Sequence, residues 1–346
     1  MPEAIAWFQD VGIDDRPSVG GKGASLGELT RAGIAVPPGF VVTTRAFELF
    51  LEALEARAPV RARIETCDAH DLASVTALAK ELRQRVVVEP LPDEVEQALL
   101  AAHRDLCGEG GVPVAVRSSA TTEDAADASF AGLQDTFLWV IDPADLVARV
   151  RECWGSLYSV ESITYRRRQA LPEAGVAMGV VVQRMVDAQV AGVMFTRSPT
   201  TGDKSVITIE GAWGLGSSVV SGEVTPDRWV IGKITGEISA RDISDKHVEH
   251  VPVASGGTEE RPVPDGRRSI PCLDDDTLQK LREVGRRVER HYGAAQDIEW
   301  AVDRDGAIML LQSRPETVWS TKATAPVAPP LANPLAHVMG VFGGRR

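Results

Sequence analysis

The side chains with the clearest chemical potential lie on two segments close to residue 300. The first segment reads Asp-Ile-Glu-Trp at 297–300, and the second reads Gln-Ser-Arg-Pro at 312–315. Because side chains alternate along a strand, Asp297 and Glu299 share one face, and a hairpin can bring Glu299 opposite Gln312. Carboxylate and amide oxygens are ligands suited to Mg²⁺, which bridges phosphates. The pattern therefore predicts a magnesium site at Glu299 and Gln312.

Arg314 shares a face with Gln312 and adds a positive charge beside this site. A guanidinium group there would neutralise charge on a phosphoryl group during transfer. The alternative is a structural ion pair between Glu299 and Arg314.

A second basic group follows the apolar run 112–116, which reads as a buried strand that ends in Arg117, Ser118 and Ser119. Arginine binds phosphate oxygens in a bidentate manner. The alternative is an Arg117 that pairs with a nearby carboxylate, such as Glu123 or Asp124.

Two glycine-containing segments also favour phosphate binding. Glycines at 20–23 surround Lys22 before a helical pattern, where backbone amides and the helix dipole favour an anion. The order is not that of a Walker motif, and a surface turn with a solvated lysine is the alternative. Residues 127–136, which include Gly132 and Thr136, suggest a mobile loop that closes over a ligand. An ordinary turn anchored by Phe130 is its alternative.

The strand-like run 180–186 contains Gln183, Arg184 and Met185 and ends in a polar break. Backbone groups of such a hinge can bind the adenine edge while apolar side chains enclose the ring, although a plain core strand fits equally. The glycine-rich segment 211–218 suits either a floor beneath a nucleotide or a tight packing loop. His247 and His250 are interpreted as surface residues, because no third ligand is evident.

These groups must be positioned by the helices and strands that the sequence pattern predicts. Helices are expected from residue 24, at 72–82, at 92–106, across 143–169 and at 275–292. Strands are expected at 5–8, 40–43, 112–116, 178–186, 190–196, 205–210, 228–232, 234–240, 297–302 and 307–313. Residues 253–271, rich in proline, glycine and charge, are expected to form an exposed loop.

Composition narrows the class of protein. The 346 residues carry a formal net charge of -12, which argues against a dedicated nucleic-acid binder but allows a local basic pocket. The four cysteines form no Cys-x-x-Cys pair, so we expect reduced thiols in a cytoplasmic protein. The N-terminus lacks a signal-peptide pattern, and no apolar run approaches the roughly 20 residues that span a bilayer.

Taken together, these motifs resemble the nucleotide domain shared by phosphoenolpyruvate synthase, pyruvate phosphate dikinase and rifampicin phosphotransferase. The similar segments are 20–26, 114–136, 192–196, 214–226 and 297–317, in the order of that family. The resemblance spans about residues 5–318. The segments around Arg117, Glu299 and Gln312 are jointly very specific.

The resemblance implies an ATP-grasp fold with ATP between two α+β lobes. Residues 1–182 would form the N-terminal lobe, with the phosphate-binding loops. Residues 183–318 would form the C-terminal lobe, with the adenine and metal sites, and 319–346 a linker-like tail. The implied site residues fall into three groups: Lys22, Arg117, Gly132, Thr136 and Arg314 for phosphates; Gln183, Arg184 and Met185 for adenine; Glu299 and Gln312 for Mg²⁺. Lys22, Arg117 and Arg314 would be catalytic.

The sequence departs from that family at one motif residue. The family often has glutamate after Gly-Leu-Gly, whereas Ser217 follows Gly216 here. Any ligand contact made by that glutamate therefore does not carry over.

The resemblance also implies a reaction that needs a partner. Family members cleave ATP to AMP and phosphate and phosphorylate a histidine on a swivelling domain. None of the six histidines lies in the matching context. We therefore expect a histidine-bearing subunit or missing domain in trans, with an acceptor such as phenol or pyruvate, as in phenylphosphate synthase. A self-contained kinase that releases ADP and a non-catalytic nucleotide sensor are the alternatives.

Overall fold

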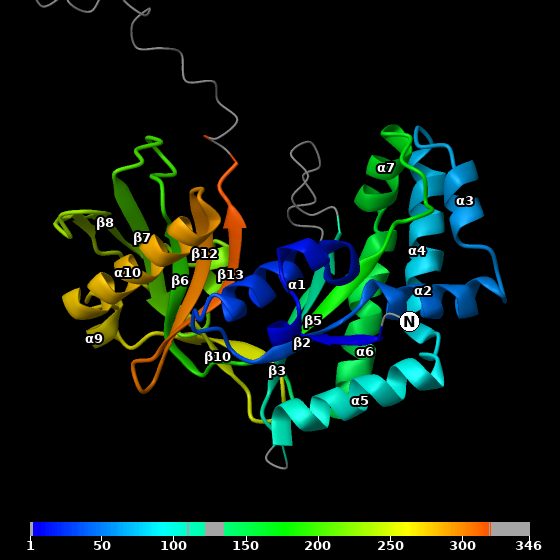
Figure 1. Ribbon diagram of the computed structural model, residues 1–346, viewed down its shortest axis with the longest axis horizontal. Helices are drawn as coiled ribbons and strands as arrows, with labels where there is room; N and C mark the ends of the chain where they lie inside the picture. The colour runs from blue at the N-terminus through cyan, green and yellow to red at the C-terminus, as the bar shows by residue number, and fades with distance from the viewer. Residues whose placement is uncertain (1–2, 109–110, 122–134, 318, 320–346) are drawn as a thin grey trace, which may run out of the picture.

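The computed structural model describes residues 3–108, 111–121, 135–317 and 319. Within them the chain forms two large sheets that lie side by side, each with its own helices, and one two-stranded hairpin (Figure 1). The α+β, two-lobed architecture of the expected ATP-grasp fold is confirmed. None of the helices in the described ranges has both the length and the apolar character that a membrane crossing requires.

The first lobe is built on a five-stranded antiparallel sheet. Its strands, in spatial order, are β1 (Ile5–Trp7), β2 (Gly39–Val42), β5 (Met178–Arg184), β3 (Val114–Ala120) and β4 (Thr136–Val140). Its helices are α1 (Arg16–Arg31), α2 (Thr44–Glu55), α3 (Arg61–Thr66), α4 (Leu72–Val88), α5 (Asp93–Cys107), α6 (Pro143–Gly155) and α7 (Val160–Arg168). Short 3₁₀ turns occupy Phe8–Asp10, Ile13–Asp15 and Ser156–Tyr158.

The second lobe is built on a six-stranded antiparallel sheet. Its strands, in spatial order, are β13 (Ile308–Pro315), β12 (Gln296–Asp303), β6 (Ala188–Phe195), β7 (Val206–Trp213), β8 (Asp227–Gly232) and β9 (Ile238–Asp242). A separate hairpin pairs β10 (Val248–Pro252) with β11 (Thr258–Pro262). The helices are α8 (Ser217–Val220), α9 (Asp265–Arg268) and α10 (Asp275–Tyr292).

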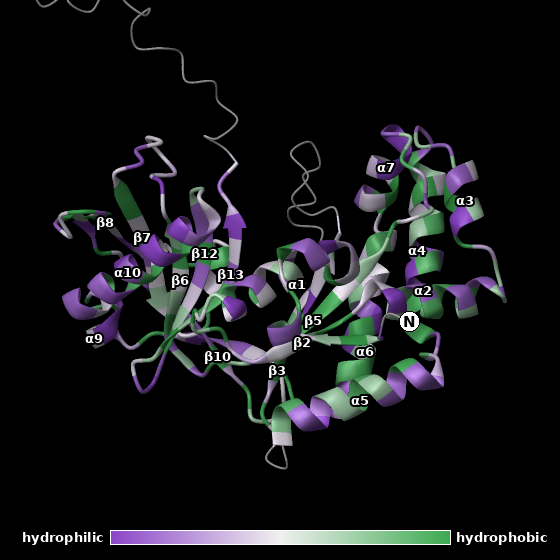
Figure 2. Ribbon diagram, in the orientation of Figure 1, coloured by the Kyte–Doolittle hydropathy of each residue, from purple (hydrophilic) through white to green (hydrophobic). Residues whose placement is uncertain are grey.

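Each sheet has a hydrophobic core on its helix-covered side. Figure 2 shows hydrophobic residues gathered on the strands and on the helix faces turned toward them. Trp154 of α6 lies in the first core, whereas Trp229 and Trp300 lie in the second. Leu29 and Ile34 also pack into the second core, although they precede all of its strands in the chain. The stretch from the end of α1 therefore ties the lobes together.

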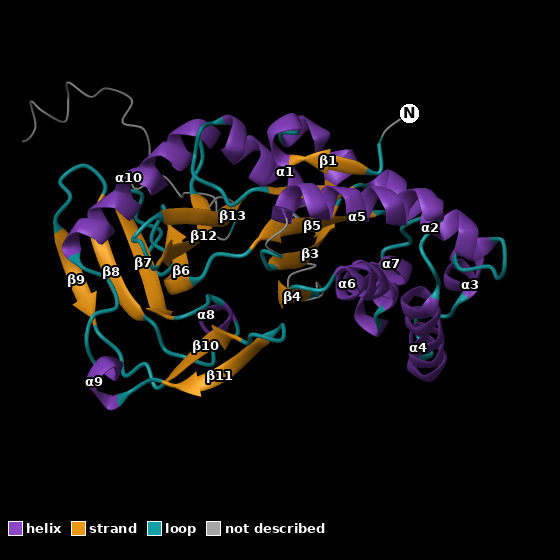
Figure 3. Ribbon diagram, turned by 90° about the horizontal axis from the view of Figure 1, so that it is seen from below, coloured by secondary structure: helices purple, strands orange, loops and turns teal. Residues whose placement is uncertain are grey.

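The β10–β11 hairpin crosses between the lobes on the side opposite α1 and α10 (Figure 3). Its turn reaches the first sheet, where the Gly257 N–H donates to the Trp139 carbonyl oxygen at 2.9 Å. The expectation of a loop over 253–271 is therefore wrong, although most of the segment is exposed as expected. The segment contains β11 and α9, and Val263 is buried. The pairing was hidden because β11 reads Thr-Glu-Glu-Arg-Pro and is exposed throughout, so no apolar alternation marks it.

Other elements also differ from expectation: α2 and α3 were not predicted, and several boundaries lie elsewhere. The strand expected at 234–240 begins only at Ile238, after a turn that closes with the Gly236 N–H donating to the Gly232 oxygen. The strand at Val112–Val116 does not end before Arg117 but continues to Ala120. Arg117 and Ser119 therefore share one face of β3, and Ser118 lies on the other.

Candidate functional site

The side chain of Arg117, on β3 of the first lobe, contacts β12 and β13 of the second lobe. Its Nη2 donates to Glu299 Oε2 at 2.7 Å and to Gln312 Oε1 at 2.9 Å, and its Nη1 donates to the Leu311 carbonyl oxygen at 2.9 Å. The side chain is largely buried. The partner of Arg117 is thus Glu299 on the other sheet. The sequence-based alternatives Glu123 and Asp124 lie outside the described residues.

The β12–β13 hairpin has the register that the sequence predicts. Glu299 pairs with Gln312, and Asp297 pairs with Arg314, so two cross-strand pairs lie next to one another. Arg314 Nε lies 3.5 Å from Asp297 Oδ2, which means that Arg314 pairs with Asp297 rather than with Glu299. Burial raises the pKa of Asp297 to about 6, although the positive charge of Arg314 opposes the shift. Arg314 itself is more than half exposed.

A cavity of about 590 Å³ opens between the two sheets beside Arg117. Both lobes line it. The first lobe contributes Ala115, Arg117, Thr136, Leu138 and residues 183–186; the second contributes Ala188, Ala191, Gly192, residues 215–217, Val220, Ser221, residues 299–301 and Leu311. The walls are mostly apolar, with a few polar groups at defined points, as in small-molecule sites.

The predicted hinge residues lie on the first-lobe wall of this cavity. Gln183, Arg184 and Met185 line it where the chain passes from β5 toward β6. Gln183 is buried and donates from Nε2 to the Pro37 oxygen at 3.3 Å. The Met185 N–H donates to the Pro113 oxygen at 2.9 Å. This N–H is therefore already hydrogen-bonded within the protein. A nucleotide base in the cavity would have to bind to neighbouring groups instead.

The glycine-rich segment before Lys22 is folded against β3. Gly20 has a φ of 71°, which kinks α1, and the Gly23 N–H donates to Ser119 Oγ at 3.1 Å. The glycines thus dock two residues away from Arg117 on the same strand face. Lys22 is buried, with 8% of its surface exposed, so the solvated lysine of the alternative interpretation is wrong. The positive charge of Lys22 also acts on the buried thiol of Cys153. Burial raises the pKa of this thiol, and the charge of Lys22 opposes the shift.

Of the two other residues expected to bind phosphate, only Thr136 lies in the described part of the chain. Thr136 begins β4, pairs with Arg117 across the sheet and lines the cavity. Gly132 lies outside the described residues. Lys22, Gln312 and Arg314 are not among the described residues that line the cavity itself.

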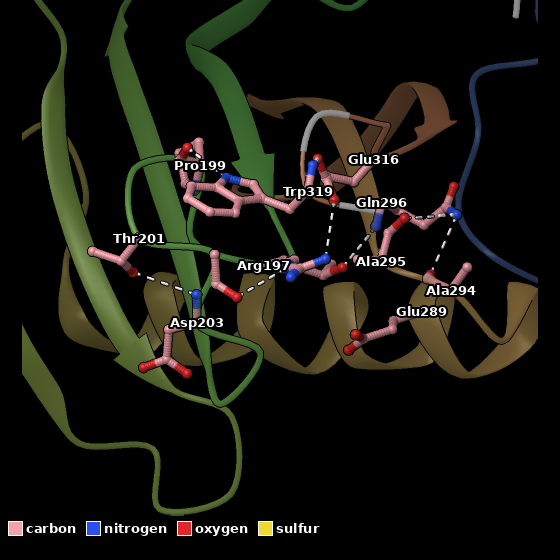
Figure 4. A network of polar contacts seen from close by, with 12 residues as sticks. Arg197, Pro199, Thr201, Asp203, Glu289, Ala294, Ala295, Gln296, Glu316 and Trp319 are labelled. Atoms are coloured by element: carbon pink, nitrogen blue, oxygen red, sulfur yellow. Dashed lines mark hydrogen bonds and ion pairs between the residues drawn. The ribbon is translucent and has the colours of Figure 1, made fainter. Parts of the chain in front are cut away.

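The chain beyond Arg314 is held by a network around Glu316 (Figure 4). The Trp319 N–H donates to Glu316 Oε1 at 2.7 Å, and its indole Nε1 donates to the Pro199 oxygen at 2.9 Å. Arg197 lies 3.5 Å from Glu316 and 5.9 Å from the Trp319 ring centroid. The strand that carries Gln312 and Arg314 is therefore fixed just after these residues. Residues 320–346 of the expected tail lie outside the described residues.

Sequence reasoning missed a polar group that lies behind the second-lobe wall. His250 was expected at the surface, but only 15% of its side chain is exposed. Its Nδ1 lies 2.7 Å from Ser217 Oγ, and Ser217 lines the cavity. The two residues lie on β10 and at the start of α8, and no spacing rule connects them. By contrast, His247 is exposed as expected.

Comparison with known protein sequences shows to which family this chain belongs. Residues 16–332 match the family described as "Pyruvate phosphate dikinase, AMP/ATP-binding domain". A probable phosphoenolpyruvate synthase of Methanothermobacter thermautotrophicus is 41% identical over 320 residues, which cover 92% of this chain and 46% of that protein. A rifampicin phosphotransferase of a Streptomyces species is 45% identical over 314 residues, which cover 90% of this chain and 35% of that protein.

Among solved structures, a biotin carboxylase complex from Campylobacter jejuni is similar at 16% identity and a TM-score of 0.26, over 72% of this chain and 41% of that chain. The chain spans less than half the length of the two curated relatives above. The match to the dikinase nucleotide domain, in contrast, runs through nearly all of this sequence. The chain therefore belongs to the family of pyruvate phosphate dikinase AMP/ATP-binding domains.

Proposed function

We propose that this chain binds Mg·ATP between its lobes and cleaves it for phosphoryl transfer to a histidine on a partner subunit or domain. In this reaction ATP, water and the histidine give AMP, inorganic phosphate and phosphohistidine. The phosphohistidine would then phosphorylate an acceptor such as phenol or pyruvate. The observation that carries the proposal is Arg117, which extends from the first lobe onto Glu299 and Gln312 of the second at the edge of the cavity.

The residues can be assigned roles within this proposal. Residues 1–182 supply the phosphate-binding groups Lys22, Arg117, Gly132 and Thr136. Gln183, Arg184 and Met185, at the end of the first-lobe strand β5, supply the wall around adenine, and the second lobe, which extends to residue 318, supplies Arg314 at the phosphates. Catalysis rests on Lys22, Arg117 and Arg314, which hold the phosphates in place and neutralise their charge.

Glu299 and Gln312 form a donor set that fits Mg²⁺. Glu299 Oε2 and Gln312 Oε1 both accept from the same nitrogen of Arg117, at 2.7 and 2.9 Å, so the two oxygens converge. A carboxylate and an amide oxygen are hard ligands that this ion binds together with phosphates. Bound there, the ion would neutralise charge on the phosphate oxygens.

The proposal is tested by the nucleotide product. The protein is incubated with Mg·ATP, alone and with the part of a curated relative that this chain does not cover. Nucleotides are separated by chromatography, and acid-labile phosphoprotein is measured with labelled ATP. AMP and phosphoprotein formed only with the added part support the proposal. ADP formed by the chain alone indicates a self-contained kinase, and nucleotide binding without turnover indicates a sensor.

Two variants test the assigned residues in the same assay. We expect Glu299→Ala and Arg314→Ala to abolish AMP formation, because each removes a group at the phosphates, while the circular dichroism spectrum stays unchanged. Asp305→Ala, in the turn that joins the same two strands, is the matched control and should keep full activity. Wild-type activity in either site variant would refute the assigned roles.

A further inference from the structure

The hydroxyl group of Ser119 on β3 bridges two backbone groups of α1. Its Oγ donates to the Val19 carbonyl oxygen at 2.9 Å and accepts from the Gly23 N–H at 3.1 Å. Positions 19 and 23 are four residues apart, which is the spacing of a backbone hydrogen bond in a regular α-helix. The hydroxyl group therefore spans α1 at the point where Gly20 departs from helical geometry.

Gly20 cannot cap the helical turn that follows it. In a capped helix, the side chain of the residue before the first turn accepts a hydrogen bond from an N–H two or three positions later. Here that N–H belongs to Gly23, but Gly20 has no side chain, and an added Cβ would overlap the Ser119 carbonyl oxygen. The Ser119 hydroxyl group accepts the hydrogen bond instead. The turn that contains Lys22 is thus capped by a residue of another element.

The surroundings of Ser119 leave this cap little freedom. Ser119 is fully buried, and it pairs with Gly179 on the neighbouring strand β5. Gly179 lets the kink approach the sheet closely, because a Cβ at this position would lie only 2.8 Å from the Val19 oxygen. Both strands have neighbours on each side in the first sheet. The hydroxyl group therefore holds the segment from Val19 to Gly23 against the interior of the sheet.

Arg117 lies two residues before Ser119 on the same face of β3. One strand thus carries one of the two basic side chains assigned to phosphate in the first lobe, and through a hydroxyl group it holds the segment that carries the other. We propose that Ser119 is a positioning residue, which fixes Lys22 relative to Arg117 by bridging Val19 and Gly23. Ser119 is not among the described residues that line the cavity, so it acts through Lys22.

The inference rests on the proposed function and is tested by binding measurements on the full chain. Dissociation constants of ATP and adenosine are measured by isothermal titration calorimetry. Ser119→Ala removes both hydrogen bonds and should bind ATP about fivefold to tenfold more weakly than the wild type, the effect of one hydrogen bond lost at the phosphates. Adenosine has no phosphates, so its affinity should stay unchanged. Ser119→Cys keeps the shape of the side chain with a weaker donor and should lose part of the ATP affinity.

A double-mutant cycle shows whether Ser119 acts through Lys22. Lys22→Met should weaken ATP binding, and adding Ser119→Ala to it should cause less than about a twofold further loss, because the group that Ser119 positions is already absent. Ser156→Ala is the matched control. Ser156 is another buried serine of the first lobe, and its Oγ donates to the Cys153 oxygen at 2.6 Å. This variant should bind ATP and adenosine as the wild type does.

The outcomes separate this inference from the proposed function. An equal loss of affinity for ATP and adenosine in Ser119→Ala would overturn the positioning role, and so would the full loss of ATP affinity in the Lys22→Met background. Wild-type ATP affinity in both Ser119 variants would overturn it as well. These results leave the role of Lys22 standing. If Lys22→Met binds ATP as tightly as the wild type, the assignment of Lys22 to phosphate fails, and the inference fails with it.

Discussion

Arg117 occupies the oxygens that we assign to the metal. In the structure its guanidinium group donates to both Glu299 and Gln312, so a cation and this side chain compete for the same two acceptors. A bound triphosphate offers the guanidinium group stronger partners, because charge-assisted bonds to phosphate are bidentate. We therefore propose that Arg117 links the lobes when no nucleotide is bound and contacts the phosphates when nucleotide binds.

This competition predicts the metal affinity of a variant. Without nucleotide, Arg117→Met should bind Mn²⁺ about tenfold more tightly than the wild type, since Glu299 and Gln312 lose a charged donor worth ~1.5 kcal/mol or more. The same variant should bind ATP more weakly. Free Mn²⁺ is counted by electron paramagnetic resonance. Arg149→Met, which breaks ion pairs within α6, is the control. A Mn²⁺ affinity that is unchanged or lower in Arg117→Met would contradict the competition.

At the scale of the elements, the kink in α1 requires a glycine at position 20. Gly20 adopts a φ of 71°, and a Cβ there would overlap the Ser119 carbonyl oxygen. Ser119 Oγ also donates to the Val19 oxygen at 2.9 Å, so strand and kink are joined in both directions. The kink therefore sets where Lys22 lies relative to Arg117.

Gly20→Ala should destabilise the protein more than an equivalent change elsewhere. The positive φ alone costs about 1–3 kcal/mol for a residue with a side chain, and the overlap with β3 adds about 1–3 kcal/mol. Gly33→Ala is the matched control: its φ is 68°, but nothing lies within 4 Å of an added Cβ, so only the first cost applies. Urea unfolding measures both. Equal losses of stability would show that contact with β3 is unimportant.

How far these elements could be predicted depends on how local their causes are. The Glu299–Gln312 pairing followed from strand alternation and a tight turn, because both strands lie within one hairpin. The Arg117–Glu299 contact joins residues 182 positions apart, and no sequence period encodes that approach. The hydrogen bond between Ser217 and His250 was missed for the same reason, because it forms only when β10 packs beside the end of β7.

In the molecule as a whole, α1 links the two lobes through side chains that contact β13 and α10 of the second lobe. Ser25 Oγ donates to the Ser313 oxygen at 2.6 Å, and Glu28 Oε1 lies 2.6 Å from His291 Nε2 on α10. Partial burial by itself raises the pKa of Glu28. The hydrogen bond with His291, helped by the Ile13 N–H and by nearby positive charge, outweighs burial and holds this pKa below its usual value.

This shift gives the contact between the lobes a pH dependence with a definite sign. A carboxyl group whose pKa is lower in the folded state stabilises the protein above its unfolded pKa, and that stability is lost as the pH falls through the folded value. Glu28→Gln should therefore be less stable than the wild type at pH 7 by about 1–2 kcal/mol, the usual size for a charge-assisted bond. The difference should shrink steadily below the model-compound pKa of 4.5.

Unfolding free energies from urea titrations between pH 7 and pH 3 measure this difference directly. Glu81→Gln serves as the control, because Glu81 pairs with Arg63 at the surface of the first lobe and does not contact the second. Solvent screens an exposed ion pair of this kind, so its effect should be smaller at pH 7. If Glu28→Gln instead kept the same deficit at pH 3 as at pH 7, the carboxylate charge would not stabilise the junction, and the apolar packing of Leu29 and Ile34 would have to hold the lobes together without it.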